Sequence, residues 1–78
     1  MQMKPEKAIK SMTDEFRRAQ DLFPKFHSNH EGYAVIKEEM DELWDEIKKE
    51  KGTKGNEAMK KELIQVGAMA LRFLNDLY

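Results

Sequence analysis

The chain has 78 residues, of which 37% are charged and 40% hydrophobic, and its formal net charge is −1. A chain of this length, taken as a single domain over 1–78, buries only about 60% of its unfolded surface, so association is expected to complete its core. It has no cysteine, which excludes disulfides and cysteine-based metal sites. The balanced charge predicts no nucleic-acid partner, and the lack of a long apolar run predicts no membrane span. We therefore expect a cytoplasmic protein.

The first element is a helix expected over residues 5–23. Pro5 suits the first helical position, and apolar residues recur at steps of three and four from Ile9 to Phe23. Pro24 should end or kink this helix, because proline disfavours helical geometry in the residue before it. Residues 26–28 then form a short linking segment.

A second helix is expected over residues 29–51. Ser28 and Glu31 have the spacing of a capping box, which places the helix start close to Ser28. Its apolar stripe consists of Tyr33, Ile36, Met40, Leu43, Trp44 and Ile47. The helix stops before Gly52, and residues 52–56 form a loop in which Thr53 or Asn56 is the cap of the next helix.

The third helix is expected over residues 57–77. Between Leu63 and Leu74 only Gln65 and Arg72 are strongly polar, which indicates a helix buried on most of its circumference. The first two helices cannot readily cover the third one on every side. The sequence therefore predicts an all-α, three-helix chain that completes a four-helix core by dimerisation.

Six carboxylates and no basic residue lie between residues 37 and 48. On a helical wheel Glu39, Glu42 and Glu46 form a row beside the apolar stripe. The outer face carries Glu38, Asp41 and Asp45. Like charges three or four residues apart repel by roughly 0.2–0.5 kcal/mol per pair. The row is therefore either a solvated acidic face or part of a site in which a cation relieves the repulsion.

The third helix supplies a complement to this row. Glu62, Gln65, Arg72 and Asp76 lie along one edge of an otherwise apolar cylinder. If the two edges face each other, three or four carboxylates converge, and charges about 4 Å apart repel by about 4 kcal/mol at an effective dielectric near 20. Such a cleft would need protons, Arg72 or divalent cations. Carboxylates completed by water and substrate phosphates are the ligands that Mg²⁺ prefers.

Glu39-x-x-Glu42 followed by Glu62-x-x-Gln65 resembles the Glu-x-x-Glu … Glu-x-x-Asp signature of the MazG-like all-α nucleoside triphosphate pyrophosphohydrolases. The resemblance covers about residues 26–77 and includes the apolar context of both motifs. It implies an Mg²⁺- or Mn²⁺-dependent hydrolase that cleaves a nucleoside triphosphate between the α- and β-phosphates. The products of this reaction would be a nucleoside monophosphate and pyrophosphate, and its role would be control of the nucleotide pool. The expected active form is a homodimer or a higher oligomer such as a tetramer.

By this resemblance Glu39, Glu42 and Glu62 are metal ligands, and Glu38 or Glu39 is the catalytic carboxylate that orients the attacking water. Gln65 stands where the family has a ligating aspartate, and an amide oxygen can coordinate Mg²⁺ but supplies no charge. Three alternatives follow: Gln65 completes a site with fewer metals, the chain is a non-catalytic MazG-like binding protein, or Gln65 makes a hydrogen bond between helices.

Two candidate substrate contacts lie outside the acidic motifs. His27 follows Phe26 at a distance before Glu39 that resembles the Phe-His of the deoxycytidine triphosphate pyrophosphatase type; otherwise it is a loop histidine near a cap. Arg72 can grip a phosphate bidentately, or it can pair with Asp76 one turn away.

The remaining candidates are lysines and aromatic residues. Lys54 and Lys61 lie near the start of the third helix and could meet the β- and γ-phosphates, or they belong to a solvated set. Phe16 or Phe23 could stack on a base, although a role in the core is the preferred interpretation. Trp44 is expected to fill the core or a dimer interface.

Overall fold

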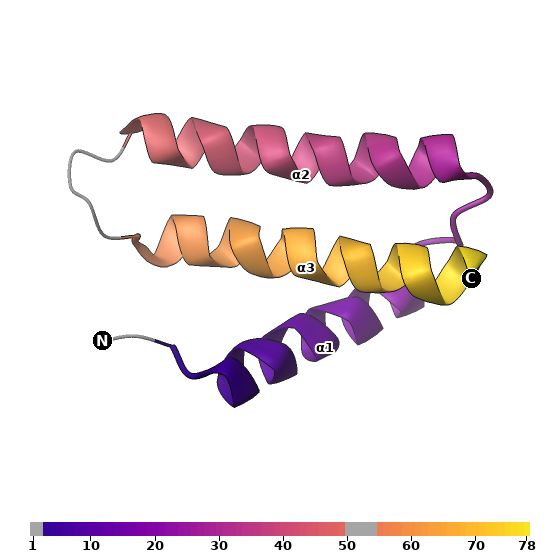
Figure 1. Cartoon of the computed structure of the whole chain (residues 1–78), viewed down its shortest axis with the longest axis horizontal. Helices are drawn as coiled ribbons and strands as arrows, with labels where there is room; N and C mark the ends of the chain where they lie inside the picture. Colours follow the sequence, from indigo (N-terminus) through magenta and orange to yellow (C-terminus); the bar gives the residue numbers. More distant parts are fainter. Residues whose placement is uncertain (1–2, 50–54) are drawn as a thin grey trace.

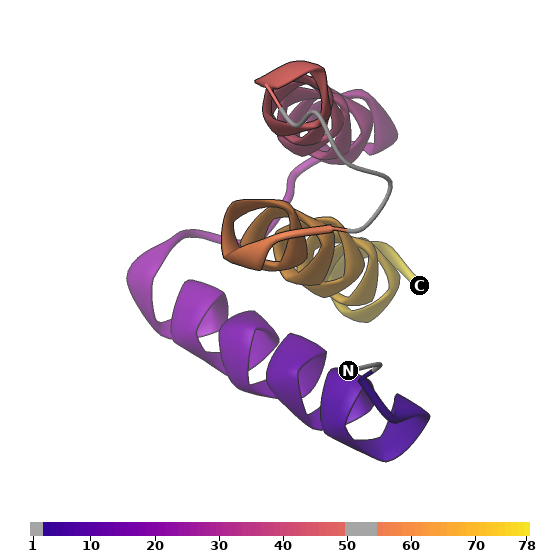
Figure 2. The ribbon, with the colours of Figure 1, turned by 90° about the vertical axis from the view of Figure 1, so that its left-hand side faces the viewer.

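The computed structural model describes residues 3–49 and 55–78, which form three α-helices and no strand (Figure 1). The helices are α1 (Pro5–Leu22), α2 (Asn29–Lys49) and α3 (Glu57–Leu77). α3 lies in the middle, and α1 and α2 pack on opposite sides of it without packing on each other (Figure 2). The prediction of an all-α, three-helix chain is confirmed. Within the described residues, no helix combines the length and apolarity that crossing a membrane requires.

Proline chemistry sets the end of α1. Phe23 has extended backbone angles (φ −125°, ψ 149°), as expected of a residue that precedes proline, and α1 ends at Leu22, one residue earlier than predicted. The Phe23 N–H still donates to the Ala19 carbonyl at 2.9 Å. Residues 23–28, called the connector below, then lead across the end of α3 to α2.

The start of α2 confirms the capping prediction with one change. Ser28 Oγ accepts from the Glu31 N–H at 3.1 Å, whereas Glu31 Oε1 accepts from the His27 N–H at 2.9 Å instead of from the N–H of the cap residue itself. The backbone of His27 is thereby fixed beside the helix start. The predicted end of α2 at residue 51 lies outside the described residues.

α3 begins at Glu57 and ends at Leu77, as predicted. Asn56 is its cap, because the Asn56 side-chain oxygen accepts from the Met59 N–H at 2.9 Å. The alternative cap, Thr53, lies outside the described residues.

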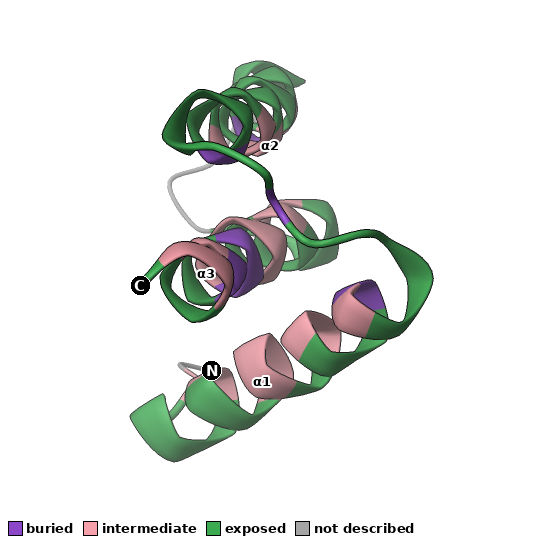
Figure 3. Cartoon of the chain, turned by 90° about the vertical axis from the view of Figure 1, so that its right-hand side faces the viewer, coloured by how far each residue is buried: buried purple, intermediate pink, exposed green. Residues whose placement is uncertain are grey.

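The core is small and gathers around α3 (Figure 3). Its buried members are Ala19 of α1, Phe26 of the connector, and Ala68 and Met69 of α3. Partly buried side chains surround them, namely Phe16, Val35, Ile36, Phe73 and Leu77. Phe16 therefore packs in the core, which confirms the preferred interpretation of that residue.

Two glycines permit the close approach of the outer helices to α3. A Cβ atom at Gly32 of α2 would lie 2.5 Å from Cδ2 of Phe73, and one at Gly67 of α3 would lie 2.6 Å from Sδ of Met12 on α1. The missing side chains thus leave room for an aromatic ring on one side of α3 and a methionine on the other.

Much of the apolar surface stays exposed in the single chain. The exposed apolar face consists of Tyr33, Met40, Trp44 and Ile47 of α2 with Leu63 and Leu74 of α3. On α3 itself Leu63 is 52% exposed and Leu74 is 60% exposed, so in one copy of the chain the expected burial of α3 does not extend to this side of the helix. The physical reason is that α1 and α2 cover only two opposite sides of α3.

Candidate functional site

Three carboxylates, called the acid triad below, meet between α2 and α3. Glu39 and Glu42 lie one turn apart on α2, and Glu62 lies in the first half of α3. Each offers one oxygen, and these oxygens all lie within 4.8 Å of one another. The acidic edges of α2 and α3 therefore face each other, as expected. The three acids that meet there are the ones that the resemblance implies as metal ligands.

The environment of the triad opposes the ionisation of Glu39 and Glu62. Burial, with the nearby charges of Glu42 and Glu62, raises the pKa of Glu39 from 4.5 to about 7. Burial and the charge of Glu42 also raise the pKa of Glu62. Without a cation, Glu39 therefore stays partly protonated close to neutral pH. A divalent ion would relieve the same repulsion, and oxygen donors of this kind suit Mg²⁺ or Mn²⁺.

Gln65 lies beside two members of the triad. With its NH₂ group facing the carboxylates, Nε2 donates to Glu39 Oε2 at 2.8 Å and to Glu62 Oε2 at 3.3 Å. The opposite orientation would place the amide oxygen against acceptors only, so the donor orientation is the stable one in the metal-free site. This arrangement is the hydrogen bond between helices that was one alternative for Gln65. Ligation of a metal would require the amide to turn over.

A cavity of about 640 Å³ opens next to the triad, between α1, the connector, α2 and α3. Its acidic end is lined by Glu38, Glu39, Glu42 and Gln65, and its connector end by Phe23, Lys25, His27 and Arg72. Gln65 and Arg72 are seven residues apart on α3, which separates the two ends by about 10 Å along the helix axis. The cavity therefore offers one end that attracts cations and one that carries positive charge.

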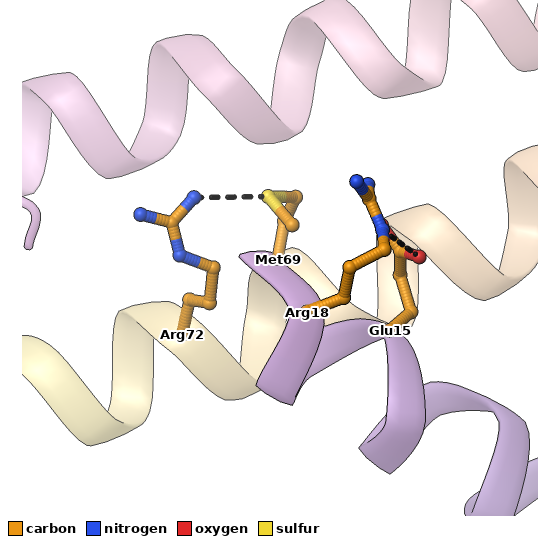
Figure 4. A network of polar contacts seen from close by, with 4 residues as sticks. All are labelled: Glu15, Arg18, Met69 and Arg72. Carbon is orange, nitrogen blue, oxygen red and sulfur yellow. Dashed lines mark hydrogen bonds and ion pairs between the residues drawn. The ribbon is translucent and has the colours of Figure 1, made fainter. Parts of the chain in front are cut away.

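Arg72 forms part of the connector end. It is 4% exposed and is the one charged side chain that is buried among the residues described. Its guanidinium donates to Gln20 Oε1 at 3.2 Å and to the Pro24 carbonyl at 2.9 Å. It also donates to Met69 Sδ at 3.6 Å (Figure 4). It also lies 4.4 Å from the ring centroid of Phe26. Arg72 therefore ties α1 and the connector to α3.

Asp76 continues the same network one turn further along α3. Its carboxylate accepts from the Phe26 N–H at 3.0 Å and from Gln20 Nε2 at 3.1 Å. Burial opposes ionisation, but the hydrogen bonds from Phe26, Asn75 and Gln20 and the charge of Arg72 lower the pKa of Asp76 overall. Gln20 lies between Arg72 and Asp76, so the direct ion pair considered for them is replaced by a bridged one.

A second guanidinium reaches the cavity from α1. Arg18 Nε donates to Glu15 Oε1 at 2.8 Å, and this bond lowers the pKa of Glu15. Arg18 and Arg72 extend from different helices toward the space beneath α2 (Figure 4). Sequence analysis did not single out Arg18, because its pairing with Glu15 at i−3 has the spacing of an ordinary surface ion pair.

The other predicted site residues are dispersed. Glu38 is exposed on the cavity wall, and His27 lines the connector end. Lys61 lies instead on a separate cavity of about 190 Å³, shared with Glu15. Glu46 is ion-paired with Lys49 at 3.0 Å. Lys54 lies outside the described residues.

Comparison of the chain with protein-family models, with curated proteins and with solved structures found no match. The function proposed next therefore depends on the motif and on the geometry of the site.

Proposed function

We propose that the protein is a metal-dependent nucleoside triphosphate pyrophosphohydrolase that releases a nucleoside monophosphate and pyrophosphate. The observation that supports this most is the acid triad, whose oxygens gather within 4.8 Å and two of whose members, Glu39 and Glu42, line one end of a cavity of about 640 Å³. The order of these acids along the chain is also the one that resembles the MazG-like signature. A cavity that is lined by carboxylates at one end and also bordered by the Arg18 guanidinium suits a triphosphate that carries a metal ion.

In this proposal Glu39, Glu42 and Glu62 hold the metal. A bound Mg²⁺ or Mn²⁺ would neutralise the triphosphate and lower the pKa of a water molecule. Glu38 lines the same end of the cavity without belonging to the triad, and its carboxylate would orient the attacking water. Arg18 borders the cavity and would stabilise negative charge on phosphate oxygens, whereas the guanidinium of Arg72 is already bonded to Gln20 and to the Pro24 carbonyl. His27 would contact the nucleotide from the connector.

Gln65 favours one alternative function, a MazG-like binding protein without catalysis. Its amide donates to two acids of the triad and supplies no negative charge of its own. In this alternative the site binds a metal nucleotide without turning it over. Calorimetry with Mg²⁺ and a nonhydrolysable triphosphate detects binding in both cases, whereas release of pyrophosphate occurs only in the enzyme.

We also propose that two copies of the chain associate through the exposed apolar face. The accessible surface is 6122 Å², about 1,200 Å² more than is usual for a compact monomer of 9.2 kDa. A standard interface buries about 800 Å² per partner, so the excess is large enough for a stable dimer. On helical wheels this face lies on the other side of the α2–α3 pair from the acid triad, so pairing would complete a four-helix core and leave the cavity open.

The dimer is tested by sedimentation of the native chain and of Trp44→Glu. The native chain should sediment as a dimer or tetramer, and the substitution should shift it to monomer by burying a charge in the interface. Asp45→Lys, on the outer face of the same helix, is the control and should leave the mass unchanged. A native chain that is monomeric at high micromolar concentration would contradict the proposal.

The enzymatic proposal is tested with purified protein, Mg²⁺ or Mn²⁺, and a broad panel of ribo- and deoxynucleoside triphosphates. Pyrophosphate should be released from at least one of them, and Glu39→Gln or Glu62→Gln should abolish turnover while far-ultraviolet circular dichroism stays helical. Asp41→Asn is the matched control, because Asp41 is exposed on α2 and paired with Lys37 at 3.2 Å. Absence of pyrophosphate with every nucleotide and both metals would refute the enzyme.

A further inference from the structure

Phe23 is an aromatic residue that the fold places at the cavity and leaves half exposed. It is 54% exposed and lines the cavity, whereas Phe16 packs in the core. Pro24 forces Phe23 out of the helix and into extended geometry. The side chain therefore leaves the packed face of α1 and contributes to the cavity wall.

The backbone next to Phe23 is fixed by a hydrogen-bonded network that includes Arg72. The Arg72 guanidinium carbon lies 5.9 Å from the centroid of the Phe23 ring and is itself buried. Arg72 donates to the Pro24 carbonyl, and Asp76 accepts from the Phe26 N–H, so the backbone on both sides of Lys25 is fixed to α3. A platform whose geometry is set before binding loses little entropy when a ligand stacks on it.

The position of Phe23 relative to the acid triad points to the part of a nucleotide that it would meet. The acidic end and the connector end are about 10 Å apart along α3, a length that a phosphate group cannot span but a phosphate, sugar and base together can. Between the two ends the cavity wall includes the apolar side chains of Ala19, Val35 and Met69. With the phosphates at the acids, the sugar would lie along this apolar wall and the base would reach Phe23 at the connector end.

We propose that Phe23 is the platform on which the nucleobase of the substrate stacks, while the acid triad holds the metal and the phosphates. This rests on the proposed function, because the acids decide where the phosphates lie. Stacking on one aromatic face suits every base, so Phe23 contributes affinity for bases in general.

The test compares nucleotides with substrates that lack a base. Phe23→Ala should raise KM for the preferred nucleoside triphosphate about tenfold, with kcat little changed, and leave KM for inorganic tripolyphosphate unaltered. Phe23→Trp should retain the native KM, since a larger aromatic face still stacks. Leu22→Ala is the matched control, because Leu22 is adjacent, 60% exposed and absent from the cavity wall.

The outcomes separate this inference from the proposed function. Turnover by the native chain with an unchanged KM in Phe23→Ala would overturn the platform and leave the enzyme intact. If the native chain releases no pyrophosphate, the platform is tested by calorimetry, which compares the binding of deoxynucleoside monophosphates with that of deoxyribose 5-phosphate. A preference for the monophosphates that Phe23→Ala removes and Leu22→Ala keeps would support the platform. Equal binding of both ligands, or binding of neither, would refute it.

Discussion

Replacing Glu39 with glutamine should stabilise the metal-free protein above neutral pH, because it removes a carboxylate that folding forces close to two others. Glutamine matches glutamate in shape, so packing between α2 and α3 is preserved. The pKa of Glu39 rises on folding from 4.5 to about 7. Below about pH 4.5 the carboxyl is protonated in both the folded and the unfolded chain, and no stability is lost there.

As the pH rises from 4.5 to 7, the unfolded chain releases this proton and the folded chain retains it. The free energy of unfolding therefore falls over this window and becomes constant above about pH 7. An increase in pKa of this size corresponds to at most about 3 kcal/mol. Glu39 is partly exposed, so solvent screening reduces the expected loss to about 1 kcal/mol.

The assay is urea unfolding at pH 4.5, 6 and 8, followed by circular dichroism at one protein concentration and with a chelator present. The free energy of unfolding of Glu39→Gln should exceed that of the native chain by about 1 kcal/mol at pH 8 and equal it at pH 4.5. Asp41→Asn should leave the free energy of unfolding unchanged at both pH values, since Asp41 is exposed on the same helix. Addition of Mg²⁺ at pH 8 should stabilise the native chain more than Glu39→Gln. Parallel pH profiles for the native chain and Glu39→Gln would refute the repulsion between the acids.

Three further substitutions test the surroundings of the site. Gln65→Asp should raise the affinity for Mg²⁺ about tenfold in calorimetry by adding a fourth carboxylate, and an unchanged affinity would exclude position 65 from the metal shell. Gly32→Ala should lower the free energy of unfolding by about 1–2 kcal/mol, because the new Cβ would collide with the Phe73 ring; a gain in urea unfolding would contradict this contact. Arg72→Lys should cost about 2 kcal/mol in thermal unfolding, since an ammonium cannot reproduce the separate bonds of the guanidinium, and native stability would show that the network contributes little.

The sequence predicted the helices well because their signals are local. Spacing of apolar residues located all three, Pro24 ended α1, and the Asn56 side chain capped α3. The acid triad was also predictable, since residues 39 and 42 share a helix face and α3 packs beside α2.

The sequence could not predict features that depend on which helices touch. It does not reveal that α1 packs on α3 alone, so Arg18 was missed at the cavity. The preferred interpretation of Phe23 as a core residue is wrong, because Phe23 is 54% exposed and lines the cavity. From its spacing Arg72 lies at the polar edge of α3. In the structure it is buried, and its guanidinium donates hydrogen bonds to Gln20 and to the Pro24 carbonyl. Trp44 belongs to the apolar stripe of α2. The spacing of apolar residues does not say whether such a residue is covered by the same chain or by another copy.

The central position of α3 has a consequence for how the chain acquires its structure during synthesis. α1 and α2 leave the ribosome first, yet neither packs on the other, and isolated helices of about 20 residues are marginal in water. The connector is fixed by Arg72 and Asp76, which lie in the last two turns of α3. The nascent chain should therefore lack stable tertiary structure until those turns have emerged, and collapse onto α3 in a single late step.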